Sequence, residues 1–230
     1  MQNKVVIVTG AFGALGRVVA ETFIKRGARV ALIDKAAAPP AELAAACGDK
    51  GLMLGNVDLS NRSETAQAVE KVWKHFGSID VLVNIAGGFR WTKVADTAPE
   101  VWDLLYTLNL KTAANMCHSC LPALTAANGR IVNVGANAAI KAAAGMGPYT
   151  ASKAGVHRLT EALAEELKGK VAVNAVLPSI IDTPQNRADM PDADPSTWVT
   201  PADLANVILF LSSADAGAMT GALVPVTGKV

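Results

Sequence analysis

The chain has 230 residues, of which 51% are hydrophobic and 18% are charged. This composition excludes an intrinsically disordered chain, and the length is enough for one large α/β domain with a buried core. The formal net charge is only +1, so no strong positive field favours binding to a nucleic acid or to an anionic membrane surface.

Short apolar runs rich in β-branched residues alternate with stretches of helical periodicity. The predicted strands are 5–9, 29–33, 52–55, 80–83, 130–134, 171–177 and 223–226. The predicted helices are 14–26, 40–47, 61–76, 99–120, 148–168 and 201–212. Almost wholly apolar strands are typical of a sheet that helices cover on both faces. The alternation therefore predicts a single α/β domain over residues 1–230, a Rossmann-type doubly wound parallel sheet of about seven strands with helices on both faces.

Residues 179–200 are the one long segment without clear periodicity, and they are rich in Asp, Pro and Asn. A loop of this length inside a compact domain usually has a function, often as a lid over a site. We therefore expect this segment to be a substrate loop or lid.

A glycine-rich turn follows the first predicted strand and leads into the first predicted helix. It consists of Gly10, Ala11, Phe12, Gly13, Ala14, Leu15 and Gly16. Glycines let the backbone approach a pyrophosphate, and the helix N-terminus presents free N–H groups to the anion. Asp34 ends the second predicted strand, where an acidic side chain accepts hydrogen bonds from the adenosine ribose. The glycine-rich turn and the Asp34 carboxylate together predict a dinucleotide site. Because this carboxylate would repel a 2′-phosphate, we expect NADH to be preferred over NADPH.

Tyr149 and Lys153 are four residues apart and therefore share one helix face. A tyrosine hydroxyl is a poor acid–base group at neutral pH, because its pKa is about 10. A nearby ammonium group favours the phenolate, so we expect Lys153 to lower the pKa of Tyr149. Taken alone, such a pair is more often an ordinary feature of a helix.

Further motifs stand in a specific order along the chain. They are Asp58-Leu59 after the third strand, Asn84-Ile85-Ala86-Gly87 after the fourth, Asn109 in the fourth helix, Tyr149-Thr150-Ala151-Ser152-Lys153, and Pro178 with Thr183. With the glycine-rich turn, these motifs resemble the short-chain dehydrogenase/reductase family over essentially the whole chain. The resemblance implies an NAD(H)-dependent oxidoreductase.

The resemblance also implies roles for these residues. Asp58 and Leu59 would border the adenine, and Asn84, Ala86 and Gly87 would line the cofactor cleft, although bracing of the backbone is an alternative for Asn84 and Asn109. Lys153 would hold the nicotinamide ribose, Asn109 would help to order a proton-relay water, and Tyr149 would transfer the proton. Pro178, the Ile181 backbone and the Thr183 hydroxyl would hold the carboxamide and phosphate side. Paired helices of this family imply a homodimer or tetramer.

Two positions depart from the family pattern. The middle glycine of the first turn is Ala14, and Ala136 stands where the family has its catalytic serine. Because Ala136 has no hydroxyl to polarise a carbonyl, three alternatives follow. Asn137 substitutes for the serine, the substrate does not need that donor, or the protein is inactive.

Local segments are similar to the dihydropteridine reductase group, which reduces quinonoid dihydropterin with NADH and likewise has alanine in place of the serine. They include Ala86-Gly87-Gly88-Phe89, Gly145-Met146, Asp182-Thr183-Pro184 with Asn186-Arg187, Met190-Pro191, and Ser196 with Trp198. A quinonoid ring is electron-poor and accepts hydride without a second hydroxyl, provided that Tyr149 donates the proton. We expect Phe89, Ala136, Asn137 and Trp198 to face the substrate, with the two aromatic rings stacking on a flat pterin or simply packing.

Three hypotheses result: a dihydropterin reductase, a short-chain carbonyl or alcohol dehydrogenase that uses Asn137 or water in place of serine, and a cofactor-binding regulator without catalysis. Retention of Tyr149, Lys153 and Asn109 argues against the regulator.

The cysteines and histidines predict no redox or metal chemistry. Cys117 and Cys120 form a CxxC inside a predicted helix, which favours buried structural thiols. His75, His118 and His157 show no metal-ligand spacing, and we expect His157 to lie at a helix interface. Three cysteines cannot make a disulfide framework, and no apolar run is long enough for a signal peptide or a membrane span, so we expect a cytoplasmic protein.

Overall fold

Seven parallel strands form one sheet in the computed structural model, which describes residues 1–48 and 51–229. The strands are β1 (Val5–Thr9), β2 (Arg29–Ile33), β3 (Leu52–Leu54), β4 (Val81–Asn84), β5 (Arg130–Val134), β6 (Ala172–Pro178) and β7 (Leu223–Val226). Their order is β3-β2-β1-β4-β5-β6-β7, so the direction of winding reverses between β1 and β4. Ligands of such folds bind outside the carboxyl ends of the strands at this reversal.

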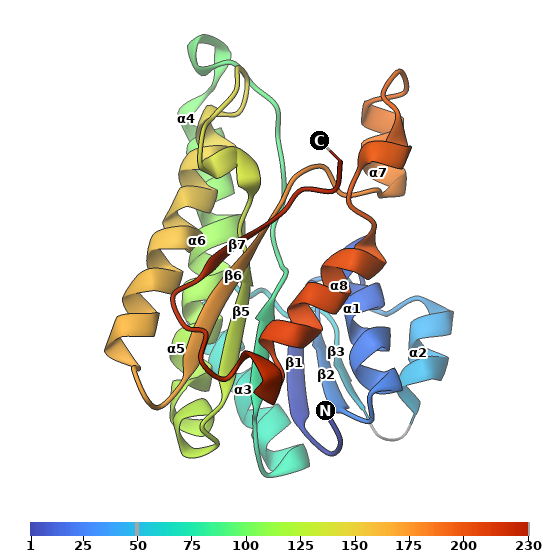
Figure 1. The fold of residues 1–230 in the computed structure, drawn as a ribbon, viewed down its shortest axis with the longest axis vertical. Coiled ribbons are helices and arrows are strands. Elements are labelled where there is room, and N and C mark those ends of the chain that lie inside the picture. Colours follow the sequence, from blue (N-terminus) through green and yellow to red (C-terminus); the bar gives the residue numbers. More distant parts are fainter. Residues whose placement is uncertain (49–50, 230) are drawn as a thin grey trace.

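Helices cover both faces of the sheet (Figure 1). The α-helices of the described residues are α1 (Ala14–Lys25), α2 (Ala41–Cys47), α3 (Arg62–Phe76), α4 (Pro99–Leu105), α5 (Thr112–Ala126), α6 (Gly147–Glu166), α7 (Pro184–Asp189) and α8 (Pro201–Leu211), of which α7 lies beyond the end of the sheet. Successive side chains of β1 belong to different cores: Val6 and Val8 pack with α1 and α8, whereas Val5 and Ile7 pack with α3 and α5. This alternation explains why β1 is apolar throughout, and the predicted doubly wound fold is confirmed.

The helix predicted over residues 99–120 is more complex than its periodicity indicates. It is continuous to Ala126, but the stretch Tyr106–Lys111 between α4 and α5 is a π-helix. The predicted end at residue 120 is wrong, because α5 continues through Pro122, an exposed position. The extra turn buries Leu124 completely, and this apolar burial favours continuation despite the proline.

The segment 179–200 is not a loop throughout. It contains α7 and a 3-10 turn at Pro195–Thr197, and a β-bridge between Ile181 and Val199 joins its two ends. The Thr183 hydroxyl caps α7 by accepting from the Asn186 N–H at 3.2 Å. Periodicity did not predict α7, because six residues are too few to show it. In Figure 1, α7 lies at the end of the molecule opposite the N-terminus. The carboxyl ends of the strands point toward the end that holds α7.

Among the described residues, no helix combines the length and the apolar character that crossing a membrane requires.

Candidate active site

The glycine-rich turn has the shape that a pyrophosphate needs. Gly10 has a φ of 61°, and a β-carbon there would lie 2.9 Å from the Ala86 backbone, so the turn packs directly on the segment after β4. Gly13 is the N-cap of α1, and no side chain caps that helix end. Its first N–H groups are thus available to an anion, which fits a dinucleotide phosphate.

Asp34 fastens this turn to the end of β2. Its Oδ2 accepts from the Phe12 N–H and its Oδ1 accepts from the Ala36 N–H, both at 2.9 Å. A carboxylate has about four acceptor positions, so two remain for a ribose. The predicted contact of Asp34 with the ribose stays a prediction.

Asp58 and Lys35 form an ion pair at 2.9 Å beside Asp34. Hydrogen bonds from Ser60 and Lys35 lower the pKa of Asp58 to about 2. Both side chains are well exposed, so the pair contributes little to stability. The Asp58 carboxylate opposes the positive charge of Lys35. Lys35 is the cationic residue nearest to Asp34 along the chain.

Asn84 turns its side chain into the core. Its Nδ2 donates to Asn133 Oδ1 at 2.9 Å and to Cys117 Sγ at 3.4 Å, and Asn133 Nδ2 donates in turn to Thr160 Oγ1 at 2.9 Å. The Oδ1 atom of Asn84 is buried and has no hydrogen-bond partner among the described residues. These contacts support the bracing interpretation of Asn84.

The segment after β4 is held by Thr9, whose hydroxyl accepts from the N–H groups of Ile85 and Ala86 at 3.0 and 3.2 Å. A β-carbon on Gly87 would lie 2.5 Å from Asn109 Oδ1 and 3.5 Å from Lys153 Nζ. Only glycine therefore fits between these two side chains, and the structure brings Gly87, Asn109 and Lys153 together.

Asn109 lies in the π-helix, an irregularity that is frequent at functional sites. Its Oδ1 accepts from the Gly88 N–H at 2.9 Å, and its Nδ2 donates to Gly88 O and to Ser152 Oγ, both at 3.0 Å. Both amide hydrogens are thus engaged in bracing the loop against α6. The predicted ordering of a relay water by Asn109 is a separate role and stays a prediction.

Lys153 and Tyr149 lie on the same face of α6. The Lys153 Nζ donates to the Val134 carbonyl at 2.7 Å, and burial lowers the pKa of Lys153 to about 8. Burial also raises the pKa of Tyr149 to about 12, so the lowering expected from the ammonium group is wrong for this structure. Desolvation of the buried hydroxyl is the cause of the upward shift. The hydroxyl therefore carries its proton at neutral pH, as an unperturbed tyrosine also does.

The lowered pKa of Lys153 predicts a pH effect on stability. An unfolded lysine keeps its proton up to about pH 10.5, whereas the native one loses it near pH 8. Between these values the unfolded state binds more protons, so the contribution of Lys153 to the free energy of unfolding rises with pH, by at most about 1.4 kcal/mol per pH unit. The free energy of unfolding of wild type, relative to that of Lys153→Met, should therefore rise between about pH 8 and pH 10. Urea unfolding of both proteins at several pH values measures this difference.

The exposed Lys141 supplies the control. The Lys141→Met variant removes one exposed lysine and is measured at the same pH values. A Lys153→Met difference from wild type that follows the same pH course as that of Lys141→Met would contradict the assigned shift.

Phe89 stands beside Tyr149. The two rings meet edge to face, with centroids 4.8 Å apart and an interplanar angle of 85°. Phe89 is 49% exposed and can present its ring to a substrate, whereas Trp198 is 5% exposed and offers little surface for stacking.

Ala136 is 3% exposed and follows the end of β5. Its N–H donates to His157 Nε2 at 3.3 Å. Asn137 next begins a 3-10 turn, and within residues 1–48 and 51–229 its half-buried side-chain amide has no hydrogen-bond partner. The sequence interpretation placed His157 at a helix interface and missed this contact, although its position four residues after Lys153 pointed to the same helix face.

Leu59 is buried next to Asp58, after β3. The other predicted cofactor residues, Pro178, Ile181 and Thr183, lie on or beside the segment 179–200, and Pro178 ends β6 and is buried. The Ile181 carbonyl accepts from Asn186 Nδ2 at 2.8 Å, and the Thr183 hydroxyl is occupied as the cap of α7. Contacts of these groups with a carboxamide or a phosphate stay predictions.

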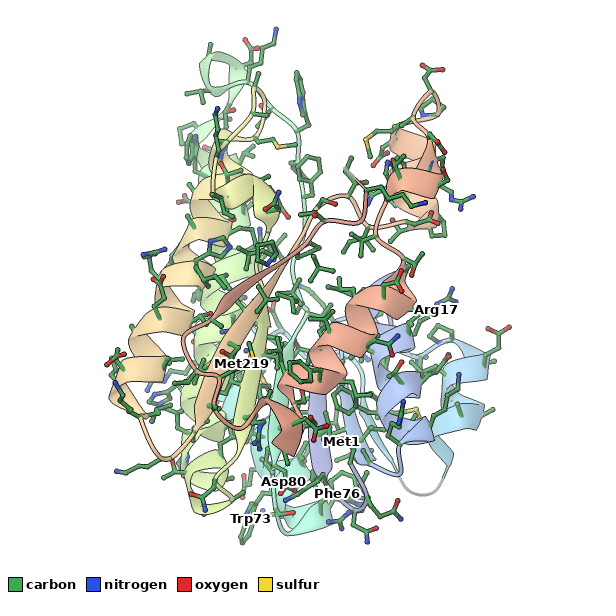
Figure 2. The ribbon with its side chains drawn as sticks, viewed as in Figure 1. Met1, Arg17, Trp73, Phe76, Asp80 and Met219 are labelled. Carbon is green, nitrogen blue, oxygen red and sulfur yellow. The ribbon has the colours of Figure 1, made fainter. Side chains whose placement is uncertain are left out.

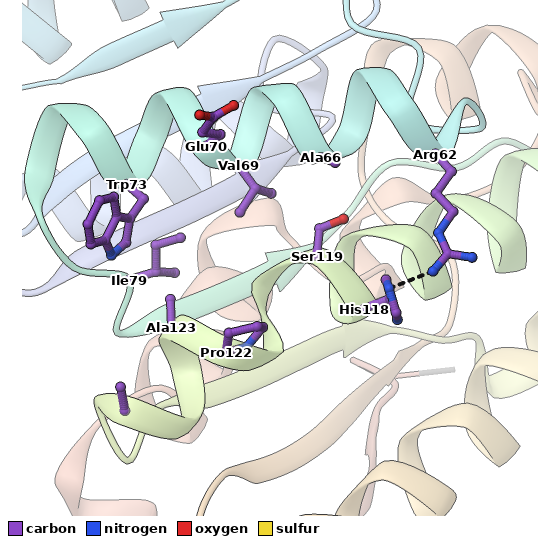
Figure 3. Close-up of a pocket in the computed structure, with 11 residues that line it drawn as sticks. Arg62, Ala66, Val69, Glu70, Trp73, Ile79, His118, Ser119, Pro122 and Ala123 are labelled. Carbon is purple, nitrogen blue, oxygen red and sulfur yellow. Dashed lines mark hydrogen bonds between the residues drawn. The ribbon is translucent and has the colours of Figure 1, made fainter.

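Two cavities lie away from this cluster. One, of about 630 Å³, is a groove between α3 and α5 that Trp73, Ile79 and Pro122 line, with a 2.7 Å hydrogen bond between Arg62 and His118 at one end (Figure 3). The other, of about 460 Å³, lies near Met1 and Asp80, at the amino-terminal end of the sheet (Figure 2). Neither contains a predicted site residue.

Cys117 and Cys120 are buried free thiols, and burial raises the pKa of both, that of Cys117 to about 12. Such thiols are unreactive, as the sequence indicated.

Comparison with known proteins places this cluster of residues in context. The profile of the short chain dehydrogenase family matches residues 4–194. The chain belongs to this family. It is 33% identical to the 3-oxoacyl-[acyl-carrier-protein] reductase FabG of Thermotoga maritima, over 99% of this chain and 98% of that protein. It is 34% identical to the 2-(R)-hydroxypropyl-CoM dehydrogenase of Xanthobacter autotrophicus, over 98% of each.

A solved structure of this short-chain dehydrogenase fold contains the expected cofactor. Carveol dehydrogenase from Mycobacterium avium in complex with NAD superposes with a TM-score of 0.88 and 27% identity, covering 99% of this chain and 97% of that one. The present protein is thus a short-chain oxidoreductase with an NAD-type binding fold. None of the three relatives named here is a dihydropteridine reductase.

Proposed function

We propose that this short-chain dehydrogenase reduces quinonoid dihydropterin to tetrahydropterin with NADH, and that Tyr149 donates the proton. The observation that carries the proposal is Ala136. The site retains Tyr149, Lys153 and Asn109 in contact with their partners, yet a buried methyl group stands where the family has a serine hydroxyl. A substrate suited to this site does not need a second hydroxyl.

The chemistry divides between cofactor and chain. Bound NADH supplies the hydride, and the pterin ring gains that hydride and one proton, so it takes up two electrons while NADH becomes NAD⁺. Tyr149 gives the proton and regains one from solvent. A ketone concentrates negative charge on one oxygen as it is reduced, whereas the conjugated pterin ring spreads that charge over several atoms. The loss of one hydroxyl donor therefore matters less for the pterin.

Phe89 supports a flat substrate. Its half-exposed ring already touches Tyr149 edge to face, so a planar ring that receives the Tyr149 proton lies within reach of an aromatic neighbour. Ala136 and Asn137 complete the substrate side of this proposal, with 179–200 as the segment that covers it.

The second candidate is a carbonyl or alcohol dehydrogenase. The names of the relatives favour it, and the unpartnered Asn137 amide is a donor that replaces the serine hydroxyl in this alternative. A regulator without catalysis is the weaker alternative, because it has no use for Tyr149.

An assay of NADH oxidation tests the proposal. The substrates are quinonoid dihydropterin and, in parallel, a panel of simple ketones and 3-oxoacyl thioesters. We expect the pterin to have the highest kcat/KM. If the protein reduces ketones or thioesters briskly and ignores the pterin, the second candidate replaces the first.

We further propose that NADH is preferred over NADPH by at least about tenfold in Kd, because the Asp34 carboxylate would face a 2′-phosphate. The Lys35 charge, which would favour NADPH, is opposed by Asp58. Asp34→Asn should narrow the difference, because the amide oxygen still accepts from the Phe12 N–H but the negative charge is gone. Titration with each nucleotide, followed by nicotinamide fluorescence, measures the ratio of the Kd for NADPH to the Kd for NADH.

Asp215→Asn is the matched control, since Asp215 is exposed and lines the cavity at the far end of the sheet. Equal affinities of wild type for the two nucleotides would remove Asp34 from this role.

We also propose a homodimer or tetramer that forms through α5 and α6. Small exposed residues on α6, such as Ala151 and Ala162, support close approach of a second copy.

A further inference from the structure

The helix face that carries Tyr149 and Lys153 extends one turn further, to His157. These residues are four apart, so their side chains follow one side of α6. This side meets the end of β5 at two points. The Lys153 ammonium donates to the Val134 carbonyl at 2.7 Å, and the Ala136 N–H donates to His157 Nε2 at 3.3 Å. Consecutive turns of α6 thus hold both ends of a three-residue segment.

The Ala136 N–H is the group at which the ladder of β5 stops. The Gly135 N–H still donates to the Val176 carbonyl of β6 at 2.9 Å, but the next N–H finds its acceptor on the His157 side chain. Ala136 is 3% exposed, so water has little access to this group. A buried N–H without an acceptor is unfavourable, and the imidazole therefore fixes the direction in which the chain leaves the strand.

Gly135 makes room for the imidazole. A β-carbon on Gly135 would lie 2.5 Å from His157 Nε2, so a side chain there would displace the ring. His157 is 2% exposed, and burial lowers its pKa, assisted by the charges of Arg158 and Lys153. A neutral ring that accepts at Nε2 carries its proton on Nδ1.

We propose that His157 is a positioning residue that sets the backbone at Ala136 and Asn137, where the substrate meets the site, and that it does so only while its ring is neutral. The inference rests on the proposed reductase activity for its assay, but the geometry is the same for a pterin or a ketone. Protonation would convert Nε2 from an acceptor into a donor that faces the Ala136 N–H. It would also add a positive charge near Lys153.

The charges that act on His157 come from Lys153 and Arg158, both on α6. Gly135 and Ala136, which follow β5, and Leu177 of β6 do not titrate. We therefore expect kcat/KM to fall as the pH drops through the lowered pKa of His157, which lies below 6.5.

Two substitutions separate positioning from packing. His157→Leu keeps apolar bulk and removes the acceptor, whereas His157→Gln places an amide oxygen near the position of Nε2 and does not titrate. His157→Leu should lower kcat/KM for the substrate about tenfold while the Kd for NADH stays within about twofold. His157→Gln should recover most of the activity, and its kcat/KM should stay flat below pH 6.5, where that of wild type falls.

A His157→Leu variant with wild-type kcat/KM and a lower Tm would show that His157 is only a core residue. A His157→Gln variant that keeps the acid limb of wild type would assign the titration to another group. Nitrogen NMR of the wild-type ring, identified by its loss in His157→Gln, needs no substrate and remains informative if His157→Leu does not fold. The Nδ1–H tautomer supports the proposal and the Nε2–H tautomer overturns it.

If wild type does not reduce the pterin, the best ketone of the panel takes its place in this assay. That result would count against the proposed function and not against His157.

Discussion

Replacing Tyr149 with phenylalanine should lower kcat about 10²–10⁴-fold and leave NADH binding intact. Phenylalanine preserves the edge-to-face contact with Phe89 at the 4.8 Å centroid separation but has no proton to give. Because burial raises the pKa of Tyr149 to about 12, wild type holds this proton throughout the neutral range. Steady-state reduction of the best substrate measures kcat. Titration by nicotinamide fluorescence measures the Kd for NADH.

Tyr106 is the other tyrosine of the chain and provides the matched control. It is 53% exposed on the π-helix, so Tyr106→Phe should leave kcat unchanged. Turnover within about threefold of wild type for Tyr149→Phe would reject Tyr149 as the proton donor.

Restoring the family hydroxyl with Ala136→Ser should raise ketone reduction by up to about 10²–10³-fold and change pterin reduction much less. The expected gain is that of one donor placed where oxyanion charge develops on a ketone. A pterin spreads this charge, so the same donor adds little. Parallel kcat/KM measurements on both substrate classes give the ratio.

Ala138→Ser is the control, because it adds a hydroxyl in the same 3-10 turn but not at the position of the family serine. An equal gain on pterin and ketone in Ala136→Ser would mean that the wild-type substrate also needs the missing donor. The second candidate function would then be favoured.

The sequence predicts the sheet well because its central strands, such as β1 and β4, are buried on both faces. Continuous apolar runs such as Val5–Val8 have no competing interpretation once helical stretches separate them. The predicted strand ends differ from the observed ones by one residue at most. Turn residues such as Gly27 and Gly77, which adopt positive φ, mark the intervening boundaries.

Features that depend on tertiary contacts were harder to predict. The π-helix at Tyr106–Lys111 has no periodicity of its own, and the six-residue helix α7 has the Thr183 cap and the Asp182–Arg187 ion pair as local contacts. The carbonyl that receives the Lys153 ammonium belongs to a strand nineteen residues earlier, so spacing alone did not reveal it. For the same reason, the spacing of Tyr149 and Lys153 could not show that burial raises the pKa of Tyr149.

The π-helix also constrains how this protein can change over evolutionary time. A π-helical turn holds one residue more than an α-helical turn, so a one-residue deletion within 106–111 would turn this stretch into regular α-helix. Asn109 would then lose its position against Gly88, although α4 and α5 would still form one continuous helix. A substitution within residues 99–126 alters one side chain. An insertion or deletion within the π-helix would separate Asn109 from Gly88 and Ser152 in a single step. Homologous chains should therefore vary in composition across this stretch and keep its length.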